Sequence, residues 1–323
     1  MPDVVLKAEH VTKKFGGITA LENAELELYK GEVHALVGAN GAGKSTLIKI
    51  ITGAYSNDEG EIYLDGQKIE VKSTFDARAK GISAVYQEFS LINTVSVAEN
   101  IFMGKLLYNN LGPIPRADWK KMNDETQKLL DSLGVTNINP ETIVGRLSVA
   151  QKQMVEIAKA LSNDLKVLIM DEPTASLSDN EIDNMFKIVK ELKAKGISIV
   201  YVSHRLEELP IICDRISVYR DGHYIKTMNI EDAPKQVIIE NMVGKHMTQT
   251  EQVTGSAVVG DSISLPERNS RTLILHCIKA RFLALQDSRE QEERNSYALC
   301  LEQIQRNPDR YLLREKRYIL NRL

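Results

Sequence analysis

The sequence predicts an α/β domain over residues 1–247, with a mixed sheet at its centre, followed by a divergent tail over residues 248–323. Short apolar stretches of strand length alternate with helix-length stretches up to about residue 245, as in a sheet that is largely parallel. A glycine-rich loop links a short apolar strand at 33–37 to a helix that opens at Lys44. The alternation stops after Gly244. These observations place one folded domain in the first three quarters of the chain.

The elements of this domain can be followed from apolar spacing and turn residues. Asp65-Gly66 has the composition of a type I′ turn, which predicts a hairpin of an antiparallel β-subdomain. Between about residues 93 and 163 the strand pattern stops, which predicts a helical insertion. Ser148 is a suitable N-cap for its second helix, although no Glu is placed to complete a capping box. The expected elements are strand 33–37, helix 44–52, hairpin 61–69, strand 82–86, helices 117–133 and 149–161, strand 166–170, helix 178–195 ending at Gly196, strand 197–202, and a closing hairpin of 215–220 and 223–227 that turns at Asp221-Gly222.

The composition of the 323 residues is typical of a globular protein, with 43% hydrophobic and 26% charged residues and a formal net charge of −3. It gives no indication of nucleic acid or a membrane surface as the main partner. No apolar run approaches the roughly 20 residues that cross a bilayer, and the N-terminus lacks the pattern of a signal peptide. Cys213, Cys277 and Cys300 have no metal-ligand spacing, so we expect free thiols in a reducing cytoplasm.

Residues 38–45 read G-A-N-G-A-G-K-S and match the phosphate-binding pattern G-x-x-x-x-G-K-[ST] in full. Glycines let such a loop wrap closely, so that its N–H groups point at phosphate oxygens, and the helix N-terminus adds its positive end. Lys44 would place a cation between the β- and γ-phosphates, and Ser45 would offer a hydroxyl to Mg²⁺. A chance glycine-rich turn is the alternative, and the motif alone indicates only an NTPase. The residues predicted to bind nucleotide here are Gly38, Asn40, Gly41, Gly43, Lys44, Ser45 and Thr46.

Two carboxylates follow the apolar strand in residues 168–172, which read L-I-M-D-E. Asp171 is expected to hold Mg²⁺ through water beside Ser45, as a Walker B aspartate does. Glu172 would then be placed to polarise the attacking water. The alternative is an ordinary strand followed by an acidic turn, because Asp-Glu-Pro also suits a turn.

Four further sequence features resemble the ABC ATPase family, over residues 4 to about 246. Gln87 resembles its Q-loop glutamine, and residues 147–151, L-S-V-A-Q, resemble its signature motif at the start of a helix. Residues 175–179, A-S-L-S-D, resemble the D-loop, and His204 resembles the switch histidine. Each feature is weak alone, whereas their order along the chain together with the P-loop and the Asp-Glu pair is highly specific.

The resemblance to this family implies a P-loop NTPase cassette that binds ATP and Mg²⁺ and hydrolyses ATP. Its catalytic residues would be Glu172, which orients water, His204, which contacts the γ-phosphate, and Gln87, which senses the nucleotide. Ser45, Gln87 and Asp171 would surround Mg²⁺.

The signature motif also points to one branch of the family. The commonest form has two glycines where this chain has Val149 and Ala150, which leaves less room beside the γ-phosphate. The form L-S-V-A-Q resembles the signature motif of the bacterial monosaccharide importers of the ribose, galactose and xylose type. In that branch Phe15 would stack on adenine, whereas a core packing residue is the alternative.

In this family two cassettes face each other head to tail, with ATP between the P-loop of one and the signature helix of the other. Ser148 would then serve the partner's ATP, and Gln151 and Asp179 complete the predicted ATP contacts. The resemblance further implies a membrane permease, an indirect link to a periplasmic sugar-binding protein, no nucleic acid, and a place on the cytoplasmic face of the bacterial inner membrane. The function would be to energise monosaccharide import. A fragment that binds ATP without coupling to transport, and a soluble ABC ATPase outside transport, are the alternatives.

The tail differs from the cassette in its basic residues. Residues 1–250 contain 23 Lys and 6 Arg, whereas residues 251–323 contain 2 Lys and 10 Arg, and no glycine follows Gly260. Importers of this branch carry two cassettes, and we expect no second cassette in residues 251–323, because a working phosphate loop needs glycines that this segment lacks after Gly260. An out-of-frame translation explains both the Lys-to-Arg exchange and the lost periodicity, and a small regulatory domain is the alternative. We expect a poorly ordered or loosely helical tail, irregular over 251–267, with isolated helices at 272–286 and 311–323.

Overall fold

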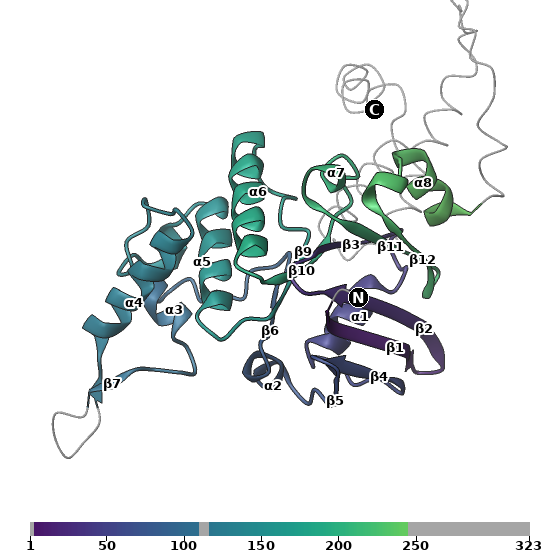
Figure 1. Cartoon of the computed structure of the whole chain (residues 1–323). Coiled ribbons are helices and arrows are strands. Elements are labelled where there is room, and N and C mark those ends of the chain that lie inside the picture. The colour runs from purple at the N-terminus through teal and green to yellow at the C-terminus, as the bar shows by residue number, and fades with distance from the viewer. Residues whose placement is uncertain (1–2, 110–115, 245–323) are drawn as a thin grey trace, which may run out of the picture. The chain divides into compact units, whose positions relative to one another are not determined.

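The computed structural model describes residues 3–109 and 116–244 (Figure 1). Within these ranges a mixed sheet is covered by helices, which is the α/β architecture that the sequence predicts. No helix of these two ranges is long and apolar enough to cross a bilayer. The predictions for the tail, including the segment at 251–267, the helices at 272–286 and 311–323 and the thiols of Cys277 and Cys300, lie outside the described residues.

One mixed sheet of ten strands runs through the described part of the chain. Its strands are β1 (Val4–Phe15), β2 (Ile18–Tyr29), β3 (Val33–Gly38), β4 (Glu59–Leu64), β5 (Gln67–Ile69), β6 (Ile82–Val85), β9 (Val167–Asp171), β10 (Ser198–Val202), β11 (Arg215–Arg220) and β12 (His223–Asn229). Their spatial order is β5-β4-β1-β2-β12-β11-β3-β10-β9-β6. Strands β11, β3, β10, β9 and β6 are parallel, whereas β5, β4, β1 and β2 pair antiparallel and form the predicted β-subdomain.

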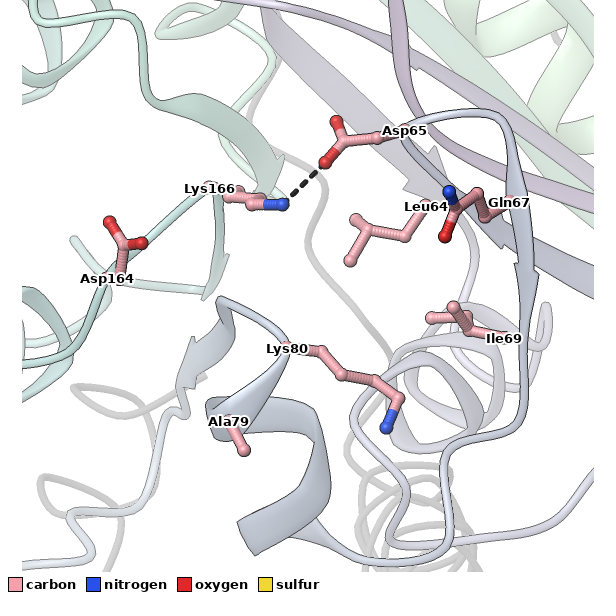
Figure 2. Close-up of a pocket in the computed structure, with 8 residues that line it drawn as sticks. All are labelled: Leu64, Asp65, Gln67, Ile69, Ala79, Lys80, Asp164 and Lys166. Atoms are coloured by element: carbon pink, nitrogen blue, oxygen red, sulfur yellow. Dashed lines mark hydrogen bonds and ion pairs between the residues drawn. The ribbon is translucent and has the colours of Figure 1, made fainter.

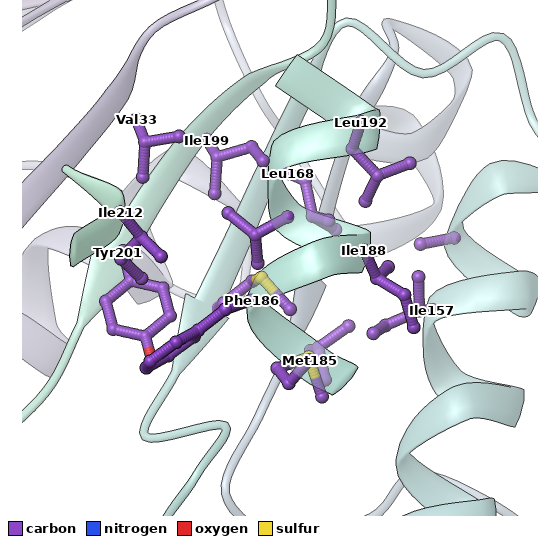
Figure 3. Packing of buried hydrophobic residues seen from close by; sticks show 14 of the residues in the cluster. Val33, Ile157, Leu168, Met185, Phe186, Ile188, Leu192, Ile199, Tyr201 and Ile212 are labelled. Atoms are coloured by element: carbon purple, nitrogen blue, oxygen red, sulfur yellow. The ribbon is translucent and has the colours of Figure 1, made fainter. Parts of the chain in front are cut away.

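Helices cover both faces of the parallel half, and its strands are accordingly largely buried and mostly apolar. The helices are α1 (Lys44–Ile51), α2 (Thr74–Ala79), α3 (Val97–Ile101), α4 (Trp119–Ser132), α5 (Val149–Leu161), α6 (Asp179–Ala194), α7 (Leu209–Ile212) and α8 (Lys235–Val243), with 3₁₀ turns at Val144–Arg146 and Ile230–Asp232. Alternate residues of β3 divide between two hydrophobic clusters, with Val33 in the cluster of α5 and α6 and Leu36 in the cluster of α1. Figure 3 shows Phe186 of α6 beside Tyr201 of β10, in the same cluster as Leu192 and Ile199.

Strands β1 and β2 are the largest departure from the sequence prediction, which gave no element to residues 4–29. The β1–β2 register shifts at four places. His10 and Asn23 have φ values of 51° and 48°, in the left-handed region that interrupts regular strands. Because each bulge breaks the two-residue alternation of side chains, apolar spacing does not reveal these strands.

The helical insertion at about 93–163 contains the two expected helices, which are α4 and α5, and also the short helix α3, which was not predicted. It also contains a short hairpin of β7 (Tyr108–Asn109) and β8 (Arg116–Ala117), so the prediction that strands stop there was wrong in this detail. The helix expected from residue 117 begins at Trp119, because the Asp118 carboxylate accepts a hydrogen bond from the Lys121 backbone N–H at 3.0 Å and caps the helix.

A capping box opens α5, contrary to the expectation that none would form. The Ser148 hydroxyl accepts from the Gln151 backbone N–H at 3.2 Å, and the Gln151 side-chain oxygen accepts from the Ser148 backbone N–H at 3.0 Å. An amide oxygen accepts the same hydrogen bond as a carboxylate, so Gln takes the place of Glu.

Backbone angles confirm the predicted turns. Asp65 and Gly66 have φ values of 50° and 75°, and Asp221 and Gly222 have 51° and 81°. A type I′ turn needs positive φ at both central residues, which Asp-Gly adopts at little cost. Gly196, at φ 84°, follows the end of α6 as expected.

A buried charged cluster ties the start of β3 to β11. Arg215 Nε donates to Glu32 Oε1 at 2.7 Å, and the Tyr29 backbone N–H donates to Glu32 Oε2 at 2.7 Å. The fully buried His34 ring lies 3.1 Å from the same carboxylate. Burial alone raises the pKa of Glu32, but hydrogen bonds with His34 and Arg215 outweigh it and hold the pKa below its ordinary value of 4.5.

Replacing Glu32 with Gln is expected to lower the free energy of unfolding at pH 7 by about 1.5–3 kcal/mol, because charged hydrogen bonds are lost in a buried site. The wild-type carboxylate contributes fully above its unfolded pKa, and this contribution is lost as the pH falls through the lower folded pKa. Stability of Glu32→Gln should therefore fall less steeply between about pH 5 and pH 3. Urea unfolding of the full chain measures both effects, with the exposed Glu70→Gln as control. Equal pH slopes for wild type and Glu32→Gln would contradict the assignment.

Candidate functional site

The predicted phosphate loop lies between the end of β3 and the start of α1, and its glycines are sterically required. A Cβ at Gly38 would lie 2.4 Å from the Tyr219 carbonyl oxygen, closer than atoms can approach. Gly43 has φ 93°, and a Cβ there would lie 2.7 Å from the Leu21 side chain. Gly41 has φ 81° with open space beside it, so its requirement is conformational. The loop therefore has the close wrapping that directs backbone N–H groups at an anion.

Lys44 lies inside this loop, with only 6% of its surface exposed. Its Nζ donates to the carbonyl oxygens of Gly38 at 2.7 Å and Ala39 at 3.1 Å. Burial lowers the pKa of Lys44 below its ordinary value, and the negative charges of Asp171 and Glu172 counteract part of this effect. The structure thus brings the predicted lysine into electrostatic contact with both predicted carboxylates.

The two carboxylates stand at the end of β9. Burial and the neighbouring charge of Glu172 raise the pKa of Asp171, whereas Lys44 acts in the opposite direction. Glu172 has φ 51°, an unfavourable conformation for a residue with a side chain, and its backbone N–H donates to the Val202 carbonyl at 3.0 Å. Strained backbone of this kind persists only where the surrounding structure fixes it, and it is concentrated at functional sites.

His204 follows β10, the strand next to β9. Val202 of β10 pairs with Asp171 of β9, so the ends of these parallel strands meet at one edge of the sheet. The His204 Nε2 atom lies 2.7 Å from Glu172 Oε1. This contact joins the predicted switch histidine to the predicted catalytic carboxylate, which are 32 positions apart in the sequence.

The donor set for a cation consists of oxygen atoms. Ser45 lies exposed in the first turn of α1, Asp171 is half-buried at the end of β9, and Gln87 is exposed after β6. Among the described residues, no three His, Cys, Asp or Glu side chains form a cluster that could hold a metal ion. Such a sparse set of hard oxygen ligands fits Mg²⁺, which takes most of its ligands from water and phosphate. Asn40 is exposed in the loop, and Thr46 is partly buried in α1.

Phe15 lies at the end of β1 and belongs to neither hydrophobic cluster, with 41% of its surface exposed. The alternative of a core packing residue is therefore wrong. Its ring packs edge-on against Tyr55 at a centroid distance of 5.2 Å, and the Lys13 ammonium lies 5.5 Å from its centroid. Tyr55 could not be predicted from the sequence, because a tyrosine after α1 carries no signal of its proximity to β1.

The signature and D-loop residues lie exposed or partly exposed at helix N-termini. Ser148 caps α5, Gln151 lies in its first turn, and Asp179 is the first residue of α6. The hydrogen bonds of Ser148 and Gln151 are local, to each other and, at 3.4 Å, from Gln151 to the Asn137 carbonyl. The structure gives no contact between them and the phosphate loop of the same chain within the described ranges.

A cavity of about 450 Å³ lies apart from these residues (Figure 2). Lys166 Nζ donates to Asp65 at 2.6 Å there, and Lys80 pairs with Asp76. Each lysine therefore already has an acidic partner, and the cavity contains none of the predicted site residues. It is lined by Leu64, Asp65, Gln67, Ile69, Ala79, Lys80, Asp164 and Lys166.

Comparison with known protein sequences points to transporter ATPases. A family model described as ABC transporter matches residues 21–175. A protein of Burkholderia ambifaria, named putative ribose/galactose/methyl galactoside import ATP-binding protein 1, is 46% identical over 75% of this chain and 46% of its own length. A ribose import ATP-binding protein of Clostridium perfringens is 44% identical over 75% of this chain and 48% of its own length. The chain spans about half the length of the curated relatives it matches.

Solved structures of similar fold are also ATP-binding cassettes of ABC transporters. The ADP conformation of an ATP-binding cassette of an ABC transporter is 30% identical, with a TM-score of 0.65, and the alignment covers 75% of this chain and 99% of that one. A nucleotide-free ATP-binding cassette from an ABC transporter is 29% identical, also with a TM-score of 0.65, over 100% of its length. With the phosphate loop, the Asp-Glu pair and the histidine gathered as described, these similarities show that the chain belongs to the ATP-binding cassettes of the ABC transporter family.

Proposed function

We propose that this cassette binds ATP with Mg²⁺, hydrolyses ATP, and thereby energises the import of a monosaccharide. The observation that carries the proposal is the grouping of charged side chains in which Lys44 interacts electrostatically with Asp171 and Glu172 and the His204 Nε2 atom lies 2.7 Å from Glu172 Oε1. A buried ammonium in a loop of backbone N–H groups suits a polyphosphate, and a half-buried carboxylate beside it suits a divalent cation.

Each residue of the grouping has a separate chemical task. Ser45 and Asp171 would hold Mg²⁺, with Gln87 approaching it from the segment after β6. Bound Mg²⁺ would neutralise charge on the phosphate groups. Glu172 orients the attacking water and accepts its proton. The contact between His204 and Glu172 would orient the Glu172 side chain. His204 would itself contact the γ-phosphate.

The site is completed by a second cassette in this proposal. Ser148, Gln151 and Asp179 lie at the N-termini of α5 and α6 and have no described contact with their own phosphate loop. Helix N-termini favour anions, so these residues suit the phosphates of ATP held by a partner cassette. The single chain would therefore act as a pair of identical cassettes or beside a different one.

The relatives' names support sugar import. A membrane permease would form the pore, a periplasmic sugar-binding protein would select the sugar, and the cassette would act on the cytoplasmic face of the bacterial inner membrane, without nucleic acid. The helical insertion has exposed apolar side chains that suit a permease contact, namely Met103, Leu106, Tyr108 and Trp119. A cassette that binds ATP without coupling, or an ABC ATPase outside transport, is the second candidate.

Phosphate release by the full chain, measured with and without Mg²⁺ at rising protein concentration, tests the proposal. Specific activity should rise with concentration, because two cassettes complete each site. Absence of both ATP binding and Mg²⁺-dependent hydrolysis would refute it. Stimulation of hydrolysis by sugar, in vesicles that contain the permease and the binding protein, separates import from the second candidate.

Replacing Phe15 with Ala is expected to weaken ATP binding by roughly tenfold, since loss of one base–aromatic stack costs about 1–3 kcal/mol. Phe15→Tyr should bind almost as the wild type does. Titration calorimetry with ATP and with inorganic triphosphate distinguishes a base contact from general damage, because triphosphate affinity should stay constant. Ile18→Ala, another exposed apolar side chain of the same hairpin, is the control. Equal losses for ATP and triphosphate would contradict adenine stacking.

A further inference from the structure

Glu208 is a buried carboxylate that the proposed reaction does not use. It occupies the N-cap position of α7 without a capping hydrogen bond from its side chain, and only 5% of its surface is exposed. Three hydroxyl groups donate to it: Thr174 Oγ1 at 2.8 and 3.0 Å to its two oxygens, Tyr201 OH at 2.9 Å, and Ser203 Oγ at 3.0 Å. Arg205 Nη1 lies 3.6 Å from Glu208 Oε1. Burying a carboxylate is costly unless it is hydrogen-bonded in this way, so the arrangement requires an explanation.

Two of the three donors come from the segments that carry the reaction. Thr174 is two residues after Glu172 and directly before the D-loop, and Ser203 directly precedes His204. One carboxylate is thus bonded to both segments, whose side chains Glu172 and His204 meet at 2.7 Å.

The hydrogen-bond directions explain why the group is a carboxylate. The Ser203 oxygen accepts from the Arg205 backbone N–H at 2.9 Å, which leaves its hydroxyl proton for Glu208. Burial raises the pKa of Tyr201, so its hydroxyl keeps its proton and donates. An ionised carboxylate only accepts, and can therefore orient all three hydroxyls, whereas an amide would direct an NH₂ group at one of them.

The third donor anchors this cluster to the core. Tyr201 is fully buried in β10, and Figure 3 shows its ring between Ile212 and Phe186. The Tyr201 hydroxyl therefore holds the Glu208 carboxylate in place relative to the sheet. The carboxylate in turn holds Thr174 and Ser203, which lie next to the catalytic residues in the sequence.

We infer that Glu208 is a positioning residue for ATP hydrolysis: it sets the spacing of Glu172 and His204 by holding Thr174 and Ser203. Glu172 has a strained backbone at φ 51°, and such a conformation needs neighbouring bonds to maintain it. The inference rests on the proposed hydrolysis. It differs from a purely structural role, in which Glu208 would only stabilise α7.

Glu208→Gln tests the inference in the full chain. We expect kcat for ATP hydrolysis to fall by about 10- to 100-fold, because small misplacement of catalytic groups has effects of this size. The KM for ATP should change less than about twofold, since Lys44 and the phosphate loop are untouched. In the Glu172→Gln background the same substitution should cause almost no further loss of single-turnover rate, because a residue that acts through Glu172 is non-additive with it.

Glu32→Gln is the matched control, because Glu32 is also a carboxylate with 5% of its surface exposed and several hydrogen bonds. It belongs to the separate charged cluster with Arg215 and His34. The Glu32→Gln substitution should lower the melting temperature and leave kcat per folded molecule unchanged. If Glu208→Gln does not fold, Ser203→Ala and Thr174→Val remove one donor each and should lower kcat in the same direction.

A lower melting temperature with normal kcat for Glu208→Gln, Ser203→Ala and Thr174→Val would overturn the inference and leave the proposed function intact. Additive losses in the Glu172→Gln background would also overturn it. A wild-type chain that hydrolyses no ATP at any concentration would instead remove the proposed function, and the inference with it.

Discussion

A chain in which Lys44 is replaced by Ala is expected to lose most of its ATP affinity, by about 100-fold or more. A charged hydrogen bond to phosphate contributes about 1.5–3 kcal/mol, and Lys44 is placed to reach two phosphates. Only 6% of the surface of Lys44 is exposed, and its ammonium donates to the carbonyl oxygens of Gly38 and Ala39 in the loop, so water cannot replace it easily. Titration calorimetry with ATP measures the loss.

The fold should survive this substitution. Removing Lys44 deletes a buried charge as well as two hydrogen bonds, and these effects oppose each other in the free energy of unfolding. Lys80→Ala removes a lysine that pairs with Asp76 beside the separate cavity, and it should bind ATP normally. Equal ATP affinity for Lys44→Ala and wild type would show that residues 38–45 are not the phosphate site.

Replacing Glu172 with Gln should retain ATP binding and reduce turnover by about 10²- to 10⁴-fold, the usual contribution of a general base. The amide keeps the size and the left-handed backbone position of Glu172 but loses the charge that aligns and deprotonates water. Measured phosphate release should therefore fall while the ATP dissociation constant stays near that of the wild type. Any dimer that ATP induces should then persist, which size-exclusion chromatography with ATP detects.

Glu207, three positions after His204 in the sequence, provides the control for Glu172→Gln. It lies on the surface and its carboxylate pairs with Lys235 at 2.5 Å. Glu207→Gln makes the same chemical change close to His204 and should hydrolyse ATP at the wild-type rate. Near-normal turnover of Glu172→Gln would show that another group activates the water.

The part of the site that sequence could predict is the part encoded by contiguous motifs. Residues 38–45 specify a loop by glycine spacing, and Asp171-Glu172 ends an apolar strand, so both motifs fix their own local structure. The hairpin turns at Asp65-Gly66 and Asp221-Gly222 were predictable for the same reason, since their backbone angles are a local property. The fold class followed from the alternation of these local elements.

What sequence could not predict depends on neighbours distant in the chain. Glu207 and Glu208 are adjacent and identical, yet one is exposed and the other is bonded to three hydroxyls. What distinguishes them is their partners in the fold, since Glu208 meets Thr174, Tyr201 and Ser203, whereas Glu207 pairs with Lys235. The β1 and β2 strands were missed because their bulges break the side-chain alternation, and Tyr55 because its partner Phe15 lies 40 positions away.

The close contact between Gly38 and Tyr219 has a consequence for the order in which the molecule matures. Strand β3 lies between β10 and β11, both made long after it: Val33 pairs with Ile199, and Gly38 pairs with Tyr219. The phosphate loop therefore leaves the ribosome well before the strands that form its support, and its non-local pairings must await them. A nascent chain stalled before β11 would contain all of residues 38–45 without the surface against which that loop is shaped. The chain should therefore bind ATP only after synthesis of the cassette is nearly complete. Bound ATP would then stabilise completely synthesised, folded chains and not incomplete ones.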